Sequence, residues 1–175
     1  MEKKRLVVDA NIVRSAGEGT EPAKLCWDIL ATIRSFCHSA VGLQFLADEW
    51  NNHSSSLAEK WQISMRRIGR HKIVLKDSPE SIQLNLYFEQ IDLSDAIRKD
   101  IHLVIAALQF DKIIISNDKI ARRNFAVSHS NIHPALGDVM WVVPDELEGT
   151  VVLNWLNSGC PINDAWKLKH LSTGA

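Results

Sequence analysis

Three aspartates adjoin apolar segments that are expected to form the core, where a charged side chain is unusual. Asp9 follows a short apolar run, and Asp118 comes two residues after the run Ile113–Ser116, in which three of the four residues are β-branched. Such runs are typical of strands that are buried on both faces of a parallel sheet. Asp100 precedes Ile101 in a helical pattern, so it lies at the rim of the apolar face. Because ligand sites in open α/β sheets lie beyond the carboxyl ends of the strands, we expect these carboxylates near one edge of the core.

The chemistry that such a carboxylate cluster supports is the binding of a divalent cation. Clustered carboxylates repel one another, and apolar surroundings raise the free-energy cost of ionising them. A bound cation offsets both the repulsion and this cost. Oxygen ligands suit Mg²⁺ or Mn²⁺ rather than Zn²⁺. Two such ions, about 3.5–4 Å apart, can activate a water and stabilise a leaving alkoxide in phosphodiester cleavage. The alternative is that Asp9 and Asp118 only cap turns, where aspartate is common.

Strands and helices that would position these acids alternate along the chain. The patterns predict strands over residues 6–9, 40–43, 73–75, 113–116 and 139–143. They predict helices over residues 22–37, 43–50, 56–68, 78–91, 94–108, 119–125 and 145–156, and a polar loop over 128–137. This alternation predicts an α/β fold, a three-layer α/β/α sandwich with a mostly parallel sheet of about five strands. We expect one domain over residues 1–157 and an irregular C-terminal tail over residues 158–175.

Composition argues against several classes of protein. The net charge of −1 gives no global field toward nucleic acid or membrane, so a polyanion needs a local basic patch. No apolar segment reaches the roughly 18 residues of a membrane span, and Asp9 interrupts the first apolar run too early for a signal peptide. Cys26 and Cys37 would lie about 16 Å apart along one helix, too far for a disulfide. We therefore expect a cytoplasmic protein with reduced thiols.

Four acidic positions, taken in order, carry a resemblance to a known family. They are Asp9 in Val-Val-Asp-Ala-Asn-Ile, Glu49 before Trp50, Asp100 ahead of Ala106-Ala107-Leu108, and Asp118 in Ile-Ile-Ser-Asn-Asp. With this order and spacing, residues 5–125 resemble a PIN-domain ribonuclease. Asp48 precedes Glu49, but Glu49 matches the family better because an aromatic residue follows it. Asn11 and Ser116 match the small polar positions beside the first and last acids.

The resemblance implies a metal-dependent endoribonuclease that hydrolyses RNA phosphodiester bonds through a metal-activated water. The four acidic positions would then be catalytic and would bind Mg²⁺ or Mn²⁺, with Glu49 either binding metal or orienting the water. A basic run, Lys119, Arg122 and Arg123, follows the last acid and could neutralise substrate phosphates. The sequence leaves open whether a protein inhibitor silences the enzyme, as in toxin–antitoxin pairs, and whether the chain forms a homodimer.

Other functions fit the same residues less well. A non-catalytic binding or assembly module could keep the fold with an idle acidic pocket, but none of the four acidic positions has a neutral residue. A nuclease acting on DNA flaps would need a helical arch segment, which we do not find. A phosphatase with an aspartyl nucleophile needs a second carboxylate where Asn11 stands. His129 and His133 are four residues apart, but we expect them in a solvated loop without further metal ligands.

Overall fold

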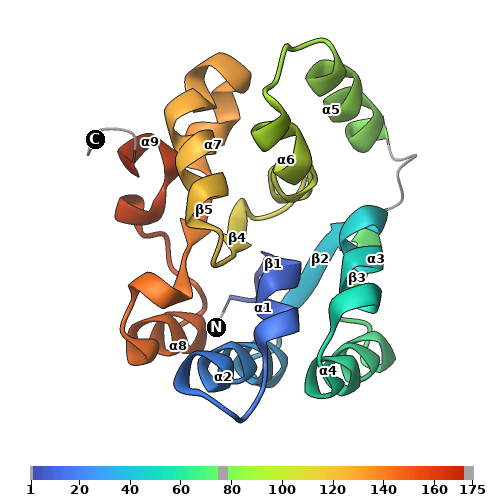
Figure 1. Ribbon diagram of the computed structural model, residues 1–175, viewed down its shortest axis with the longest axis vertical. Helices are drawn as coiled ribbons and strands as arrows, with labels where there is room; N and C mark the ends of the chain where they lie inside the picture. Colours follow the sequence, from blue (N-terminus) through green and yellow to red (C-terminus); the bar gives the residue numbers. More distant parts are fainter. Residues whose placement is uncertain (1, 75–78, 172–175) are drawn as a thin grey trace.

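One five-stranded sheet with every strand parallel lies at the centre of the computed structural model (Figure 1). Its strands are β1 Arg5–Val8, β2 Ser39–Leu43, β3 His71–Val74, β4 Ile113–Ile115 and β5 Met140–Val142. They lie in the order β3-β2-β1-β4-β5. The structure describes residues 2–74 and 79–171. The prediction of an α/β fold with a mostly parallel sheet of about five strands is confirmed.

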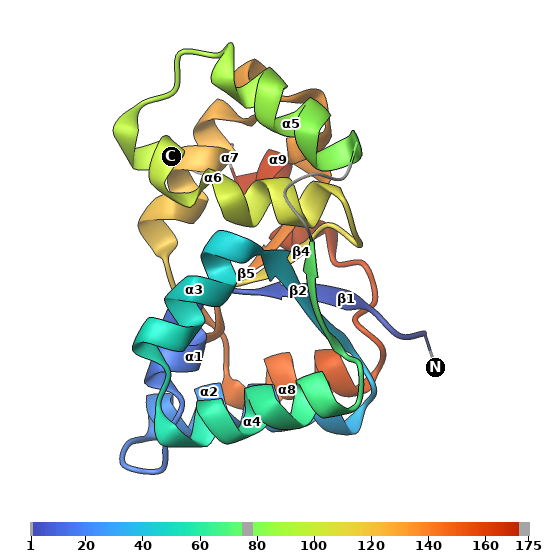
Figure 2. The same cartoon turned by 90° about the vertical axis from the view of Figure 1, so that its right-hand side faces the viewer.

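Helices cover both faces of this sheet (Figure 2). One face carries α2 Glu21–Ser35, α4 Ser56–Arg67 and α8 Gly149–Asn157, and the other carries α5 Pro79–Glu89, α6 Asp95–Leu108, α7 Lys119–Ile132 and α9 Leu168–Leu171. Short helices α1 Ala10–Ser15 and α3 Gln44–His53 begin where β1 and β2 end, and 3-10 turns lie at η1 Pro134–Asp138, η2 Pro144–Glu146 and η3 Asp164–Trp166. These layers form the predicted α/β/α sandwich.

The strands form where the sequence has short apolar runs without polar alternation. All three residues of β4 are buried, and so are the last three of β1. Val7 pairs with Val41 of β2 on one side and with Ile114 of β4 on the other. Burial on both faces explains why these strands show no alternation. Trp50 ties α3 to the end of β1, because its indole Nε1–H donates to the Val8 carbonyl at 3.1 Å.

Two predicted helix boundaries differ from the structure: the end of α7 and the start of α8. Residues 128–132 were predicted to begin a polar loop, but α7 continues to Ile132, which is buried. The loop prediction is therefore wrong for these residues, and Pro134 opens η1 instead of irregular chain. The helix predicted from residue 145 begins at Gly149, because residues 144–146 form η2. Ser55 caps α4 by accepting a hydrogen bond from the Ala58 N–H at 3.2 Å.

The segment predicted to be an irregular tail is ordered structure over residues 164–171. It contains η3 and α9, and Leu168 is fully buried. Its backbone joins β5, since the Leu168 N–H donates to the Val139 carbonyl at 3.0 Å. The prediction of irregular chain is therefore wrong there. The predicted strand end at residue 75 and helix start at residue 78 lie outside the described residues.

Two further expectations concern thiols and membranes. Cys26, Cys37 and Cys160 are all free, as expected. Burial raises the pKa of Cys26 to about 11 and that of Cys160 to about 12, so both remain thiols at neutral pH. Among the helices in the described part of the chain, none combines the length and apolar character that crossing a membrane requires.

Stability should decline as the pH falls below about 6.5, because burial lowers the pKa of His71 to about 4 and also lowers that of His38. In this range the unfolded chain binds protons that the folded chain excludes, so the free energy of unfolding falls toward acid. His71→Phe removes one such group. Between about pH 6.5 and about pH 4.5, the free energy of unfolding measured by urea titration should fall by about 2 kcal/mol less in this variant than in the wild type.

A matched control is Val41→Ala on β2, which removes buried apolar volume but no titratable group. This variant should keep the pH slope of the wild type. If His71→Phe also kept that slope, His71 would not be the source of the acid sensitivity.

Candidate active site

A pocket of about 220 Å³ lies at the carboxyl ends of β1 and β4. β1 has β2 on one side and β4 on the other, so the direction in which the chain adds strands reverses at this point. Open α/β sheets bind ligands in the crevice that such a reversal creates. The pocket is lined by the four acids predicted from the sequence: Asp9, Glu49, Asp100 and Asp118. The structure therefore brings all four together from separate parts of the chain.

Asp9 is held at the junction of β1 and β4 by neighbours on both sides. Its Oδ2 accepts hydrogen bonds from Asn11 Nδ2 at 2.8 Å and from the Ser116 hydroxyl. Asn11 Nδ2 also lies 3.1 Å from Ser116 Oγ, and Oδ1 of Asp9 accepts from the Asn11 backbone N–H at 3.3 Å. The two small polar residues predicted beside the acids thus both contact the first acid. They fix the direction of its carboxylate.

Helix capping accounts for part of the acid placement. Asp9 is the N-cap of α1, and Asp118 is the N-cap of α7, where its Oδ1 accepts from the Ala121 N–H at 2.7 Å. Asp100 is different, because it lies beyond the first turn of α6 and the unpaired backbone N–H groups of a helix are confined to that turn. The capping alternative therefore explains two of the acids and leaves Asp100 unexplained.

Glu49 reaches the pocket from α3. Its Oε2 lies 3.6 Å from Nε2 of His102, a buried residue of α6. Asp48, the other acid at this position of the sequence, does not line the acid pocket and instead lines a neighbouring one. Its Oδ1 accepts a hydrogen bond from Gln44 Nε2 at 2.8 Å. Of these two acids, Glu49 is the one that lines the acid pocket.

Burial and mutual repulsion disfavour the charged forms of two of these acids. Burial raises the pKa of Asp9, against hydrogen bonds from Ser116 and Asn11 that lower it. Burial also raises the pKa of Asp100, where the nearby Lys99 charge lowers it and the charges on Asp118 and Asp9 raise it further. A pocket in which carboxylates oppose one another's ionisation is one in which a cation is favoured.

The donor set fits a hard divalent cation. The pocket offers oxygen ligands from four carboxylates and has no histidine or cysteine in its lining. Within residues 2–74 and 79–171, no group of three or more histidine, cysteine or acidic side chains is already arranged to hold a metal ion. Asp9 and Asp118 each direct an oxygen to a backbone cap instead. To bind a cation, the carboxylate side chains would therefore have to move toward one another from the positions they occupy here.

The basic residues at the pocket differ from those predicted. Lys119, Arg122 and Arg123 do not line it, and Arg122 Nη1 is 2.6 Å from Oε2 of Glu146. The residues that do line it are Arg14 and Lys99. Arg14 lies one helical turn after Asn11 in α1, and Lys99 directly precedes Asp100, so helical spacing from a predicted acid site could have indicated both.

Histidines 129 and 133 have structural contacts rather than a metal-ligand arrangement. Nδ1 of His129 lies 2.7 Å from the Ala126 carbonyl, and Nδ1 of His133 accepts from the Ala135 N–H at 3.1 Å.

No protein-family model, no curated protein and no solved structure matches this chain. The chemistry of the site is therefore inferred from its own residues.

Replacing Ser116 with Ala should destabilise the protein by about 1–2 kcal/mol. The fully buried Ser116 hydroxyl donates to Asp9 and accepts from the Asp118 N–H at 3.0 Å, so its loss removes one of the donors to the Asp9 carboxylate and the acceptor of the Asp118 N–H. The pKa of Asp9 should rise further, because this hydrogen bond favours the charged carboxylate. Urea unfolding and an NMR titration of the Asp9 carboxyl carbon measure the two effects.

The matched control is Ser158→Ala at the end of α8, where the hydroxyl donates to the Trp155 carbonyl at 2.9 Å. It should leave the Asp9 pKa unchanged. An unchanged Asp9 pKa in Ser116→Ala as well would show that Ser116 does not control this carboxylate.

Proposed function

We propose that this protein is a metal-dependent endoribonuclease of the PIN type that hydrolyses RNA phosphodiester bonds. The observation that carries the proposal is Asp100, a carboxylate of the second turn of α6 that lines the acid pocket and has no capping role. Burial and repulsion from Asp118 and Asp9 oppose its ionisation, so the placement costs stability in the absence of a cation. Acids in such frustrated environments are concentrated at functional sites.

Each acid has a distinct part in the proposed reaction. Asp9, Asp100 and Asp118 would hold Mg²⁺ or Mn²⁺, and Glu49 would hold metal or orient the attacking water. A bound ion would supply a water of lowered pKa and would neutralise charge on the phosphate. Asn11 and Ser116 keep the Asp9 carboxylate directed into the site by hydrogen bonds. Trp50, through its bond to the Val8 carbonyl, holds α3 and so keeps Glu49 at the pocket.

Arg14 and Lys99 are the cations best placed to contact the phosphates next to the scissile bond. Both are exposed, and both line the acid pocket. Because the whole chain has a net charge of −1, attraction of RNA depends on such local cations. Arg122 is a weaker candidate, since Glu146 already neutralises it.

Asp100→Asn tests the metal site through stability as well as cleavage. Without metal the variant should be as stable as the wild type or more stable, because the raised pKa of Asp100 shows that its charge opposes folding. The stabilisation that Mn²⁺ gives the wild type should largely disappear, since metal binding to the folded state supplies it. RNA cleavage should fall by about two orders of magnitude or more. Thermal melts with EDTA and with Mn²⁺, beside a cleavage assay, measure all three.

The control is Asp95→Asn in the first turn of α6, an exposed acid outside the pocket. It should keep the metal response and the cleavage rate of the wild type. An Asp100→Asn protein that is less stable in EDTA, with its Mn²⁺ shift intact, would contradict the metal assignment. Mn²⁺ stabilisation of the wild type without cleavage of any RNA or DNA would favour the non-catalytic module.

The double variant Arg14→Ala, Lys99→Ala should weaken RNA binding evenly across sequences. Loss of two phosphate contacts should reduce the slope of log affinity against log salt by about 1.4 for a single strand. Arg122→Ala with Arg123→Ala should change the slope less, because Glu146 holds Arg122 at 2.6 Å. Fluorescence anisotropy of a labelled oligoribonucleotide in Ca²⁺ at several salt concentrations measures these slopes.

Arg67→Ala with Lys72→Ala removes two exposed cations that lie outside the acid pocket. This control should keep the wild-type slope. Equal slopes in all the variants would exclude Arg14 and Lys99 from phosphate binding.

A further inference from the structure

A second pocket, of about 320 Å³, adjoins the acid pocket along helices α3 and α6. Neighbouring residues of the same helices line the two pockets. On α3, Asp48 lines the second pocket and Glu49 the first, and on α6, Ile101 lines the second and Asp100 the first. The two pockets are therefore next to each other, with the two helices forming their shared boundary. We call the second one the α3–α6 pocket.

The α3–α6 pocket combines an exposed aromatic ring with amide groups. Phe45 is 55% exposed, although its ring centroid lies only 4.8 Å from that of His102. Gln44 and Asn85 bring side-chain amides from α3 and α5, and the Gln44 amide is oriented by its bond to Asp48. Ile101 and Ile105 supply apolar surface from α6. Such a lining suits a flat ligand that stacks on one face and has hydrogen-bonding edges.

His102 provides independent evidence for a ligand here. It lines the α3–α6 pocket and is 8% exposed, yet its Nε2 has no hydrogen-bond partner among the described residues. Nδ1 lies 3.1 Å from the Lys99 carbonyl, which can only accept, so Nδ1 carries the hydrogen. Nε2 is 3.6 Å from Glu49 Oε2, longer than a hydrogen bond. Buried polar atoms are normally paired, so an unpaired one at the boundary of two pockets indicates a site for a ligand group.

We propose that the α3–α6 pocket binds an unstacked nucleobase of the RNA, next to the phosphodiester held at the acid pocket. This inference rests on the proposed nuclease function and adds the part of the substrate that the acids do not contact. Sequence-dependent RNA recognition uses unpaired bases that stack on aromatic side chains and hydrogen-bond through their edges. Phe45 supplies the stacking surface, and Gln44, Asn85 and His102 supply edge contacts. A volume of about 320 Å³ is within the range of small-ligand pockets.

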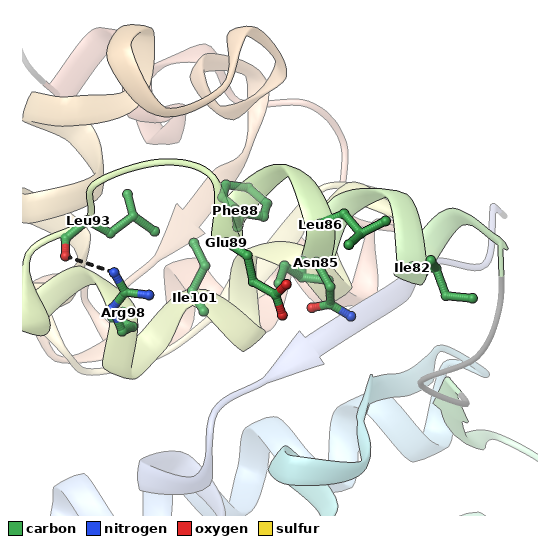
Figure 3. A pocket seen from close by; sticks show the side chains of 9 residues that line it. Ile82, Asn85, Leu86, Phe88, Glu89, Leu93, Arg98 and Ile101 are labelled. Atoms are coloured by element: carbon green, nitrogen blue, oxygen red, sulfur yellow. Dashed lines mark hydrogen bonds between the residues drawn. The ribbon is translucent and has the colours of Figure 1, made fainter.

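A helical peptide fits this surface less well. A groove between α5 and α6 shares Asn85, Ile101 and Ile105 with the α3–α6 pocket and continues past Leu86 toward Ile82 (Figure 3). A docked amphipathic helix needs a continuous apolar stripe, and the groove that offers one along α5 is lined by none of the four acids of the acid pocket. Four of the eight residues that line the α3–α6 pocket are polar, and one of them, His102, lies 3.6 Å from Glu49 of the acid pocket. The α3–α6 pocket therefore suits a base better than a helix.

The α3–α6 pocket also predicts which RNA is accepted. A base within a duplex is stacked and paired, so it cannot enter a pocket beside its own phosphate. Binding should therefore require a single strand, a loop or a bulge. Preference among bases should depend on Gln44 and Asn85, whose amides can donate and accept.

Phe45→Ala tests the pocket with two labelled single-stranded probes of equal length: an oligoribonucleotide, and the same ribose-phosphate chain without bases. Binding is measured by anisotropy in Ca²⁺, and cleavage in Mn²⁺. Loss of one stacking contact should weaken binding of the base-containing probe about tenfold, with no change for the abasic probe. Phe36→Ala, a matched exposed aromatic outside both pockets, should leave both probes unaffected. Asn85→Ala should alter the affinity ranking of oligo-A, oligo-C and oligo-U.

The outcomes separate this inference from the nuclease proposal. Tighter binding of the base-containing probe that depends on Phe45, without cleavage, would leave the nucleobase pocket in place and overturn the nuclease function. Equal binding of both probes by the wild type, or an equal loss for both in Phe45→Ala, would overturn the nucleobase pocket. The exposed apolar surface would then belong to a protein partner instead.

Discussion

The partly buried Asp9 carboxylate is the constraint on which the rest of this architecture depends. A carboxylate in low-dielectric surroundings is tolerated only if hydrogen bonds satisfy it. Here the donors come from Asn11, after β1, and from Ser116, after β4, so Asp9 is satisfied only when these two strands pair in the observed register. The Asp9 N–H extends the same ladder by donating to the Ile115 carbonyl at 3.0 Å. The pairing of β1 with β4, the capping of α1 and the position of Asp9 in the acid pocket therefore depend on one another.

The same acids serve folding and the proposed chemistry. Asp9 and Asp118 each use one carboxylate oxygen to cap a helix, which orients the side chain before any ligand arrives. Asp100 gains no such partner and lies where two like charges oppose it. Proteins often accept local destabilisation of this kind at functional sites and recover it when a ligand binds. Asp100 would be the residue at which function outweighs stability.

Local sequence patterns were sufficient to predict the features that depend on residues close in sequence. The strands could be located because their residues are apolar and β-branched, and the acids because they stand at strand ends or at the edge of a helical stripe. The end of α7 could not be predicted from the sequence. Ser128, Ser130 and Asn131 are polar, and the helix continues past them because Ile132 is buried in the tertiary structure. The neutralisation of Arg122 depends on Glu146, which is distant in sequence. The open face of Phe45 likewise depends on where α5 and α6 lie.

The chain after α8 covers one edge of the sheet. The Leu168 N–H bonds to the Val139 carbonyl, Lys167 forms an antiparallel bridge with Met140, and η3 contacts β5. An uncovered edge strand offers unpaired backbone groups to other chains and is a common start of aggregation. At the opposite edge, β3 is short and carries an exposed lysine, Lys72, which discourages such pairing. β5 is apolar at every position and has no charged residue of its own. The terminal segment therefore keeps β5 from joining sheets of neighbouring molecules, and a chain cut before Asn163 would be prone to self-association.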